Sequence, residues 1–101
     1  MRISHQTRLV LQAFLDSPED ETYGFQLAQA TGLKAGTLYP VLQRLLAEGW
    51  LAGRWEEIDE RSEGRRRRRY YGLTAVGERS ARSAVERDTG ALRELMPGWV
   101  L

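Results

Sequence analysis

Apolar side chains recur every three or four positions in several stretches of the chain, a spacing typical of amphipathic helices. It predicts helices over residues 4–16, 23–31 and 35–48, and a last helix that begins after Thr74. The inward residues of the three predicted helices are, in order, Ile3, Thr7, Val10, Leu11 and Phe14, then Phe25, Leu27, Ala28 and Ala30, then Leu38, Val41, Leu42, Leu45 and Leu46. The chain is therefore expected to be mainly helical.

The residues at the predicted helix ends favour these boundaries. Pro18 cannot continue the first helix, and Thr22 is expected to cap the second. Gly32 suits the left-handed position that closes a helix, and a third helix begins only a few residues later. Two helices joined by a tight glycine-containing turn indicate a helix-turn-helix.

After the third helix the pattern changes to aromatic-rich segments. Residues 50–57 and 67–73 predict the two strands of a hairpin, joined by a long polar connection that we expect to be a mobile tip. The residues expected to share its buried face are Leu51, Trp55, Tyr71 and Leu73. The order helix, helix, helix, hairpin, helix predicts a fold that is mainly α with a small β-hairpin, a winged helix-turn-helix followed by a C-terminal helix.

The composition excludes several functions. Among its 101 residues the chain has no cysteine and one histidine, His5, so thiolate and histidine-cluster metal sites lack ligands. No catalytic arrangement and no phosphate-binding glycine loop is recognisable, so we expect neither an enzyme nor a cofactor. No apolar run approaches the roughly 20 residues of a membrane helix. The N-terminus lacks a signal-peptide pattern, so a cytoplasmic location is expected.

The distribution of charge says more than the net charge of +1. Residues 1–60 carry five basic and nine acidic groups, a net −4, and residues 74–101 carry four of each. Residues 61–73 carry six arginines and one glutamate, a net +5, because Arg65, Arg66, Arg67, Arg68 and Arg69 are consecutive. Such a concentrated basic segment indicates a polyanionic partner.

The arginine run has two interpretations. Arginines on a wing strand bind phosphates and enter the minor groove of DNA, where the potential is strongly negative. Alternatively, the charges protect the edge of a sheet from aggregation. An acidic stretch across the connection, Glu56, Glu57, Asp59 and Glu60, is placed to neutralise some of them. We favour nucleic acid, because five consecutive arginines exceed what edge protection requires.

Four segments of the chain resemble the PadR-like family of bacterial transcriptional regulators. They are Tyr23-Gly-Phe-Gln-Leu, Gly36-Thr-Leu-Tyr-Pro-Val-Leu-Gln-Arg-Leu, Glu48-Gly-Trp-Leu and Arg69-Tyr-Tyr-Gly-Leu-Thr-Ala-Val-Gly. The resemblance implies a dimeric repressor whose third helix enters the major groove of operator DNA and whose wing reaches the flanking groove. It places Gly36, Thr37, Tyr39 and Pro40 on the family's recognition-helix motif, and Tyr23 where a backbone phosphate is expected.

The chain departs from the family pattern just before this motif. The family usually has serine and proline there, and this chain has Lys34 and Ala35, which loses a helix cap and gains a cation suited to phosphate. Elementary chemistry agrees with the DNA assignment, since a helix N-terminus attracts anions and hydroxyls bind phosphates or base edges. Gln43, one turn beyond Tyr39, suits the reading of an adenine. The alternative for Tyr39 is a partly buried packing role.

The last helix is the candidate for dimerisation. Its apolar residues are more than a small domain covers alone, and the resemblance implies pairing through the first and last helices together. The residues concerned are Val10, Phe14, Val85, Leu92, Leu95, Met96 and Trp99. The alternative is that the last helix folds back on the first within one chain. Multidrug-sensing relatives bind planar aromatic compounds with a tryptophan between such helices, which makes Trp99 a candidate for binding a small aromatic effector. The alternative, which we favour, is that Trp99 is a packing residue at the chain end.

The sequence thus predicts a winged helix-turn-helix DNA-binding domain over residues 1–73 and a dimerisation helix over residues 74–101, packed as one unit. A homodimer would read a short inverted repeat. The rival interpretation is a winged-helix protein-interaction module whose arginine run grips an acidic partner.

Overall fold

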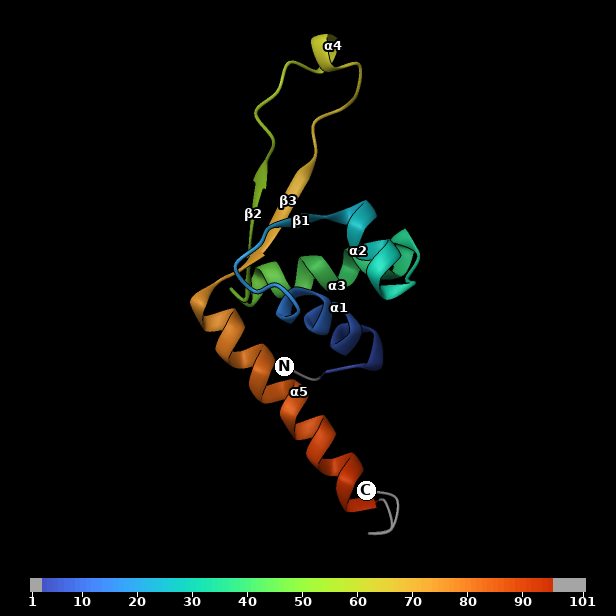
Figure 1. The fold of residues 1–101 in the computed structure, drawn as a ribbon, viewed down its shortest axis with the longest axis vertical. Helices are drawn as coiled ribbons and strands as arrows, with labels where there is room; N and C mark the ends of the chain where they lie inside the picture. Colours follow the sequence, from blue (N-terminus) through green and yellow to red (C-terminus); the bar gives the residue numbers. More distant parts are fainter. Residues whose placement is uncertain (1–2, 96–101) are drawn as a thin grey trace.

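The computed structural model describes residues 3–95, with side chains for residues 3–87 and only the backbone for residues 88–95. Its elements are α1 (His5–Leu15), β1 (Thr22–Tyr23), α2 (Gly24–Thr31), α3 (Ala35–Ala47), β2 (Leu51–Trp55), α4 (Glu60–Glu63), β3 (Arg69–Leu73) and α5 (Ala75–Leu95). Helices α1 to α3 lie in the middle, as Figure 1 shows. The wing, formed by β2, β3 and their connection, extends from one end, and α5 runs toward the other.

The helix ends follow from local chemistry. Ser4 caps α1 by accepting a hydrogen bond from the N–H of Thr7, and Thr74 caps α5 by accepting one from the N–H of Gly77 at 2.9 Å. Gly32 closes α2 with φ of 75°. The predicted Thr22 cap is wrong: Thr22 is in β1, its hydroxyl donates to the Gln26 side chain, and Tyr23 stands at the cap without a side-chain bond.

The core lies where α1, α2, α3, the base of the wing and α5 meet. The four residues Leu38, Val41, Leu42 and Leu45 of α3 are buried, as their spacing predicts. The other members of the core are Val10, Leu11, Phe14, Leu27, Leu51, Tyr71, Ala81 and Ala84. Helix α5 packs against α1 and against β3. None of the helices within residues 3–95 has the length and hydropathy needed to cross a bilayer.

The sheet has three antiparallel strands in the order β1-β3-β2, one more than the hairpin predicted from the sequence. Leu51 pairs with Leu73, Gly53 with Tyr71, and Trp55 with Arg69, so the predicted buried residues do share one face. Trp55, however, is 49% exposed, because it lies at the outer end of β2, beyond the reach of the helices. Phe25 is also exposed rather than packed inward, at 65%.

The tip of the wing contains the short helix α4 within the long polar connection. Asp59 caps it by accepting from the N–H of Arg61 and from the Ser62 hydroxyl, which lowers the pKa of the Asp59 carboxyl. Gly64 ends it in a left-handed conformation with φ of 68°. The connection therefore has local structure of its own.

Candidate nucleic-acid interface

Helix α3 presents one polar face outward, opposite the face that it buries. Gly36, Tyr39, Pro40 and Gln43 recur at steps of three and four, and all four are exposed. Helix α3 continues past Pro40, although a proline has no N–H to donate to the carbonyl of Gly36 one turn earlier. The residues predicted to read DNA thus form a continuous stripe along the helix.

The N-terminus of α3 is open to solvent. Lys34 occupies the cap position in an extended conformation and makes no side-chain capping bond, as expected from the loss of the family's serine and proline. Ala35, Gly36 and Thr37 are exposed in the first turn. Uncapped N–H groups and the helix dipole both favour an anion at this end.

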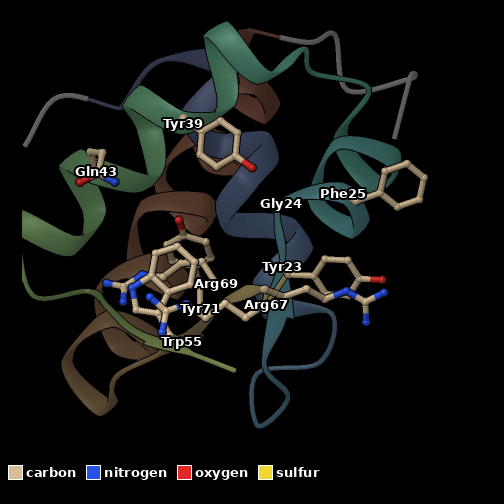
Figure 2. A pocket seen from close by; sticks show the side chains of 10 residues that line it. Tyr23, Gly24, Phe25, Tyr39, Gln43, Trp55, Arg67, Arg69 and Tyr71 are labelled. Atoms are coloured by element: carbon tan, nitrogen blue, oxygen red, sulfur yellow. The ribbon is translucent and has the colours of Figure 1, made fainter. Parts of the chain in front are cut away.

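A groove of about 450 Å³ separates the outer face of α3 from the wing. Its walls hold both aromatic and basic side chains, as Figure 2 shows. The lining residues are Tyr23, Gly24, Phe25, Tyr39, Gln43, Trp55, Arg67, Arg68, Arg69 and Tyr71. Six of these were predicted from the sequence, whereas Gly24, Phe25, Trp55 and Tyr71 were not predicted as site residues. Burial raises the pKa of the Tyr71 phenol, so this side chain remains neutral.

Tyr39 lies across the N-terminus of α2. Its hydroxyl occupies the space beside Gly24, where any added methyl group would overlap it. Its ring is 45% exposed, and its hydroxyl points from α3 toward Gly24 (Figure 2). Tyr39 is thus neither a core residue nor fully free, because its hydroxyl fills the space that Gly24 leaves open.

The arginines of the wing alternate between aromatic partners. The guanidinium carbons of Arg67 and Arg69 lie 4.8 and 5.4 Å from the centre of the Trp55 ring. The guanidinium of Arg68 lies 4.3 Å from the centre of the Tyr23 ring. Arg66 is exposed, and within residues 3–87 its guanidinium has neither a ring nor a carboxylate partner. These four arginines keep their positive charge available.

Arg65 differs from these four arginines because its guanidinium has a carboxylate partner, and its role in DNA binding stays a prediction. Its guanidinium forms a bidentate ion pair with Glu56, with N–O distances of 2.7 and 3.1 Å. For two of the other arginines, carboxylates of the acidic stretch bind the backbone N–H group and not the guanidinium. Glu56 accepts from the N–H of Arg68, and Glu60 accepts from the N–H of Arg67. The acids therefore shape the tip without neutralising Arg66 to Arg69.

A second neutralised arginine lies on the outer face of β2. Arg54 makes a bidentate pair with Glu21, with distances of 2.8 to 3.0 Å, and this bonding lowers the pKa of the Glu21 carboxyl. Arg54 also lies 4.9 Å from the ring centre of Tyr70, which meets Tyr23 edge to face. This cluster holds β1 against the wing and so fixes Tyr23 beside Arg68.

Acidification is expected to release the Glu56–Arg65 pair. The Arg65 guanidinium, with the N–H of Arg68, lowers the pKa of Glu56 from 4.5 to about 2. A lowered carboxyl pKa stabilises the folded wing above the unfolded value of 4.5, and this contribution is lost as the pH falls from 4.5 to about 2. An NMR titration of the Glu56 side-chain carboxyl and the Arg68 amide checks it. A midpoint near 4.5 in the folded protein would contradict the ion pair.

The residues predicted for dimerisation lie in different environments. Val10 and Phe14 are 0% and 2% exposed, so the core of the single chain already accounts for their apolar character. Val85 is half-buried and packs against that core. Leu92 and Leu95 lie on α5, where only the backbone is described. Met96 and Trp99 lie outside the described residues.

The three-helix core with its β-wing defines a winged helix-turn-helix protein, as the order of elements predicts. The model of the transcriptional regulator PadR-like family matches residues 17–83, well over half of the chain. The chain therefore belongs to the PadR-like family of transcriptional regulators, which are not enzymes. A comparison with curated protein sequences finds no match.

Solved structures of regulators share the fold. A PadR-like transcription factor from Bacteroides fragilis is 26% identical, with a TM-score of 0.68, and the match covers 88% of this chain and 86% of that one. A PadR family regulator from Clostridium difficile is 25% identical, with a TM-score of 0.63 and 91% of each chain covered. Reduced AbfR bound to DNA is 21% identical, with a TM-score of 0.64, over 95% of this chain and 61% of AbfR, and shows the fold alone.

Proposed function

We propose that the chain is a sequence-specific DNA-binding repressor that acts in the cytoplasm. Helix α3 would enter the major groove, and the wing would reach the adjacent minor groove. The observation that carries the proposal is the groove in which Tyr39 and Gln43 of α3 face Arg67 and Arg69 of the wing. A recognition helix beside a basic wing is suited to a duplex, which offers base edges to the helix and phosphates to the arginines. The DNA-bound AbfR structure shows that a protein of this fold binds DNA.

The proposal includes a homodimer. Residues 1–73 would form the DNA-binding unit and residues 74–101 the dimerisation helix, with Leu92, Leu95, Met96 and Trp99 at the interface. Two recognition helices would then enter successive major grooves, about one helical turn apart, on an inverted repeat. A small aromatic effector beside Trp99 would regulate binding by changing the distance between the two helices. Sedimentation or light scattering tests the dimer, and DNA titrations with candidate aromatic compounds test the effector.

The direct test of DNA binding is fluorescence anisotropy across a salt series. The probes are a labelled duplex from the region upstream of the gene and a scrambled duplex of equal length. A repressor is expected to bind the upstream duplex more tightly, with log affinity falling by about 0.9 per phosphate contacted for each tenfold rise in salt. Failure to bind either duplex at low salt would contradict the proposal.

Replacing Gln43 with alanine is expected to weaken operator binding by about 1–3 kcal/mol, because a bidentate contact to a base edge would be lost. Binding to the scrambled duplex should hardly change, since nonspecific affinity rests on phosphates. Val76→Ala is the matched control, because Val76 is 51% exposed on α5 and does not line the groove. If Gln43→Ala binds both duplexes as the control does, α3 does not read the bases through this residue.

A further inference from the structure

Trp55 occupies a position that hydrophobic burial does not explain. Its side chain is 49% exposed at the outer end of β2, away from the core. The guanidinium carbons of Arg67 and Arg69 lie 4.8 and 5.4 Å from its ring centre. Arg69 is the first residue of β3, and Arg67 precedes it by two positions. Because side chains alternate along an extended chain, the two arginines point to the same face of the wing. The single indole ring of Trp55 therefore contacts two guanidinium groups.

Arg69 also lies against a second residue of β2, Gly53. Its guanidinium passes over Gly53, where an added methyl group would come within 2.8 Å of Nη2 and 3.0 Å of Cζ. Gly53 is directly opposite Tyr71 in the register, and both Tyr71 and Arg69 line the groove. A side chain larger than hydrogen at this position would force Arg69 away from its place beside the ring. Gly53 thus leaves open the space that the Arg69 guanidinium occupies beside the Trp55 ring.

We propose that Trp55 is a positioning residue that orders Arg67 and Arg69 before DNA binds. The face of an indole ring attracts a guanidinium, which keeps its charge and can leave N–H groups free for a phosphate or a base edge while it stacks. A free arginine loses rotamer freedom when it enters a complex, whereas a stacked one has already lost part of it. The inference rests on the proposed function, because the ordered arginines would enter the minor groove beside α3.

The alternative role for Trp55 is direct contact with DNA, and it predicts a different result for combined substitutions. The indole itself lines the groove and is exposed, so it is placed to contact a sugar or a base directly. In that case its contribution to affinity would not depend on Arg67 and Arg69. If it positions the arginines, its contribution disappears once they are removed. A double-mutant cycle separates the two roles.

The first measurement uses the free protein and needs no DNA. The aromatic ring current of Trp55 should shift the side-chain NMR signals of Arg67 and Arg69 upfield. Trp55→Leu should return both sets of signals to ordinary values, while the signals of Arg66 stay unchanged, since no ring lies beside that guanidinium in residues 3–87. Thermal unfolding should hardly move, because the side chain lies outside the core. Ordinary arginine signals in the wild-type protein would overturn the stack.

The second measurement is the affinity for the upstream duplex. We expect Trp55→Leu to bind about fivefold more weakly and Trp55→Phe about twofold, because phenylalanine retains a weaker cation-binding face. In the Arg67→Ala, Arg69→Ala background, Trp55→Leu should cause no further loss, whereas in the matched Arg66→Ala background it should cause the full loss. Equal losses in both backgrounds would overturn the positioning role alone. Failure of the wild-type protein to bind any duplex would instead overturn the proposed function.

Discussion

Gly77→Ala is expected to destabilise the folded chain by about 1–3 kcal/mol or more, among the largest effects of any single methyl group in this fold. Gly77 is in the first turn of α5, and a methyl group there would overlap the carbonyl oxygen of Trp50 and lie 2.6 Å from its carbonyl carbon. Both obstructing atoms are backbone, so a rotamer change cannot relieve the overlap. Helix α5 would have to move away from the base of the wing.

Gly36→Ala provides the matched control for stability. Gly36 also lies in the first turn of a helix, and an added methyl group meets nothing within 4 Å. Alanine is favoured over glycine in helices by about 1 kcal/mol, so Gly36→Ala should be as stable as the wild type or slightly more stable. Thermal unfolding followed by circular dichroism measures both, at about 4–8 °C per kcal/mol for a chain of this size. Equal melting temperatures would show that α5 accommodates the methyl group at little cost.

The helices could be predicted from the sequence because their signals are local. The stripe from Leu38 to Leu45 has the helical period, Gly32 closes α2, and Thr74 caps α5. The bounds of α3 differ from the prediction by one residue at the C-terminus, where Glu48 is the cap. The family model and the solved structures confirm the winged-helix class that the order of these elements predicts.

The sheet could be predicted only in part, because strand pairing is not local. Strand β1 has two residues, too few for any alternation, and exists because Thr22 and Tyr23 pair with Tyr71 and Tyr70. The pattern places Trp55 on the same face as Leu51, but it contains no measure of how far along that face the helices reach. That distance is a tertiary property, and it decides that Trp55 is exposed and available to the arginines.

In the candidate site, too, the features that depend on local sequence could be predicted and those that depend on tertiary structure could not. Tyr39, Gln43 and the arginine run are predicted from residue type and spacing, and the structure brings Tyr39, Gln43 and the last three arginines of the run to one groove. Which arginine is neutralised depends on how the tip folds. Glu56 binds the Arg65 guanidinium but only the backbone of Arg68, a distinction that no count of charges contains. Gly24 has no functional side chain, so the sequence does not mark it as a site residue. Its role in making room for the Tyr39 hydroxyl follows only from the structure.

Replacing Arg67, Arg68 and Arg69 together with alanine is expected to have the largest effect on DNA affinity. The structure leaves all three guanidinium groups stacked on rings and unpaired with any carboxylate within residues 3–87. Each arginine that contacts a phosphate contributes about 0.9 to the slope of log affinity against log salt, so the slope should fall by about 2.7. Affinity at low salt should fall about 10- to 150-fold for each lost contact, because hydrogen bonds to charged groups are worth about 1.5–3 kcal/mol.

The matched control removes the neutralised pair instead. Arg65→Ala combined with Glu56→Gln deletes one positive and one negative charge, so the net charge of the wing stays the same. Because the Arg65 guanidinium is already bound to Glu56, this variant should keep the wild-type salt slope. Anisotropy titrations of both variants with the same duplex make the comparison. An unchanged slope in the triple variant would mean that phosphates are contacted elsewhere than at Arg67, Arg68 and Arg69. An equal fall in the control would mean that Arg65 contributes to phosphate binding despite its pair with Glu56, and that the arginines stacked on Trp55 and Tyr23 have no special part.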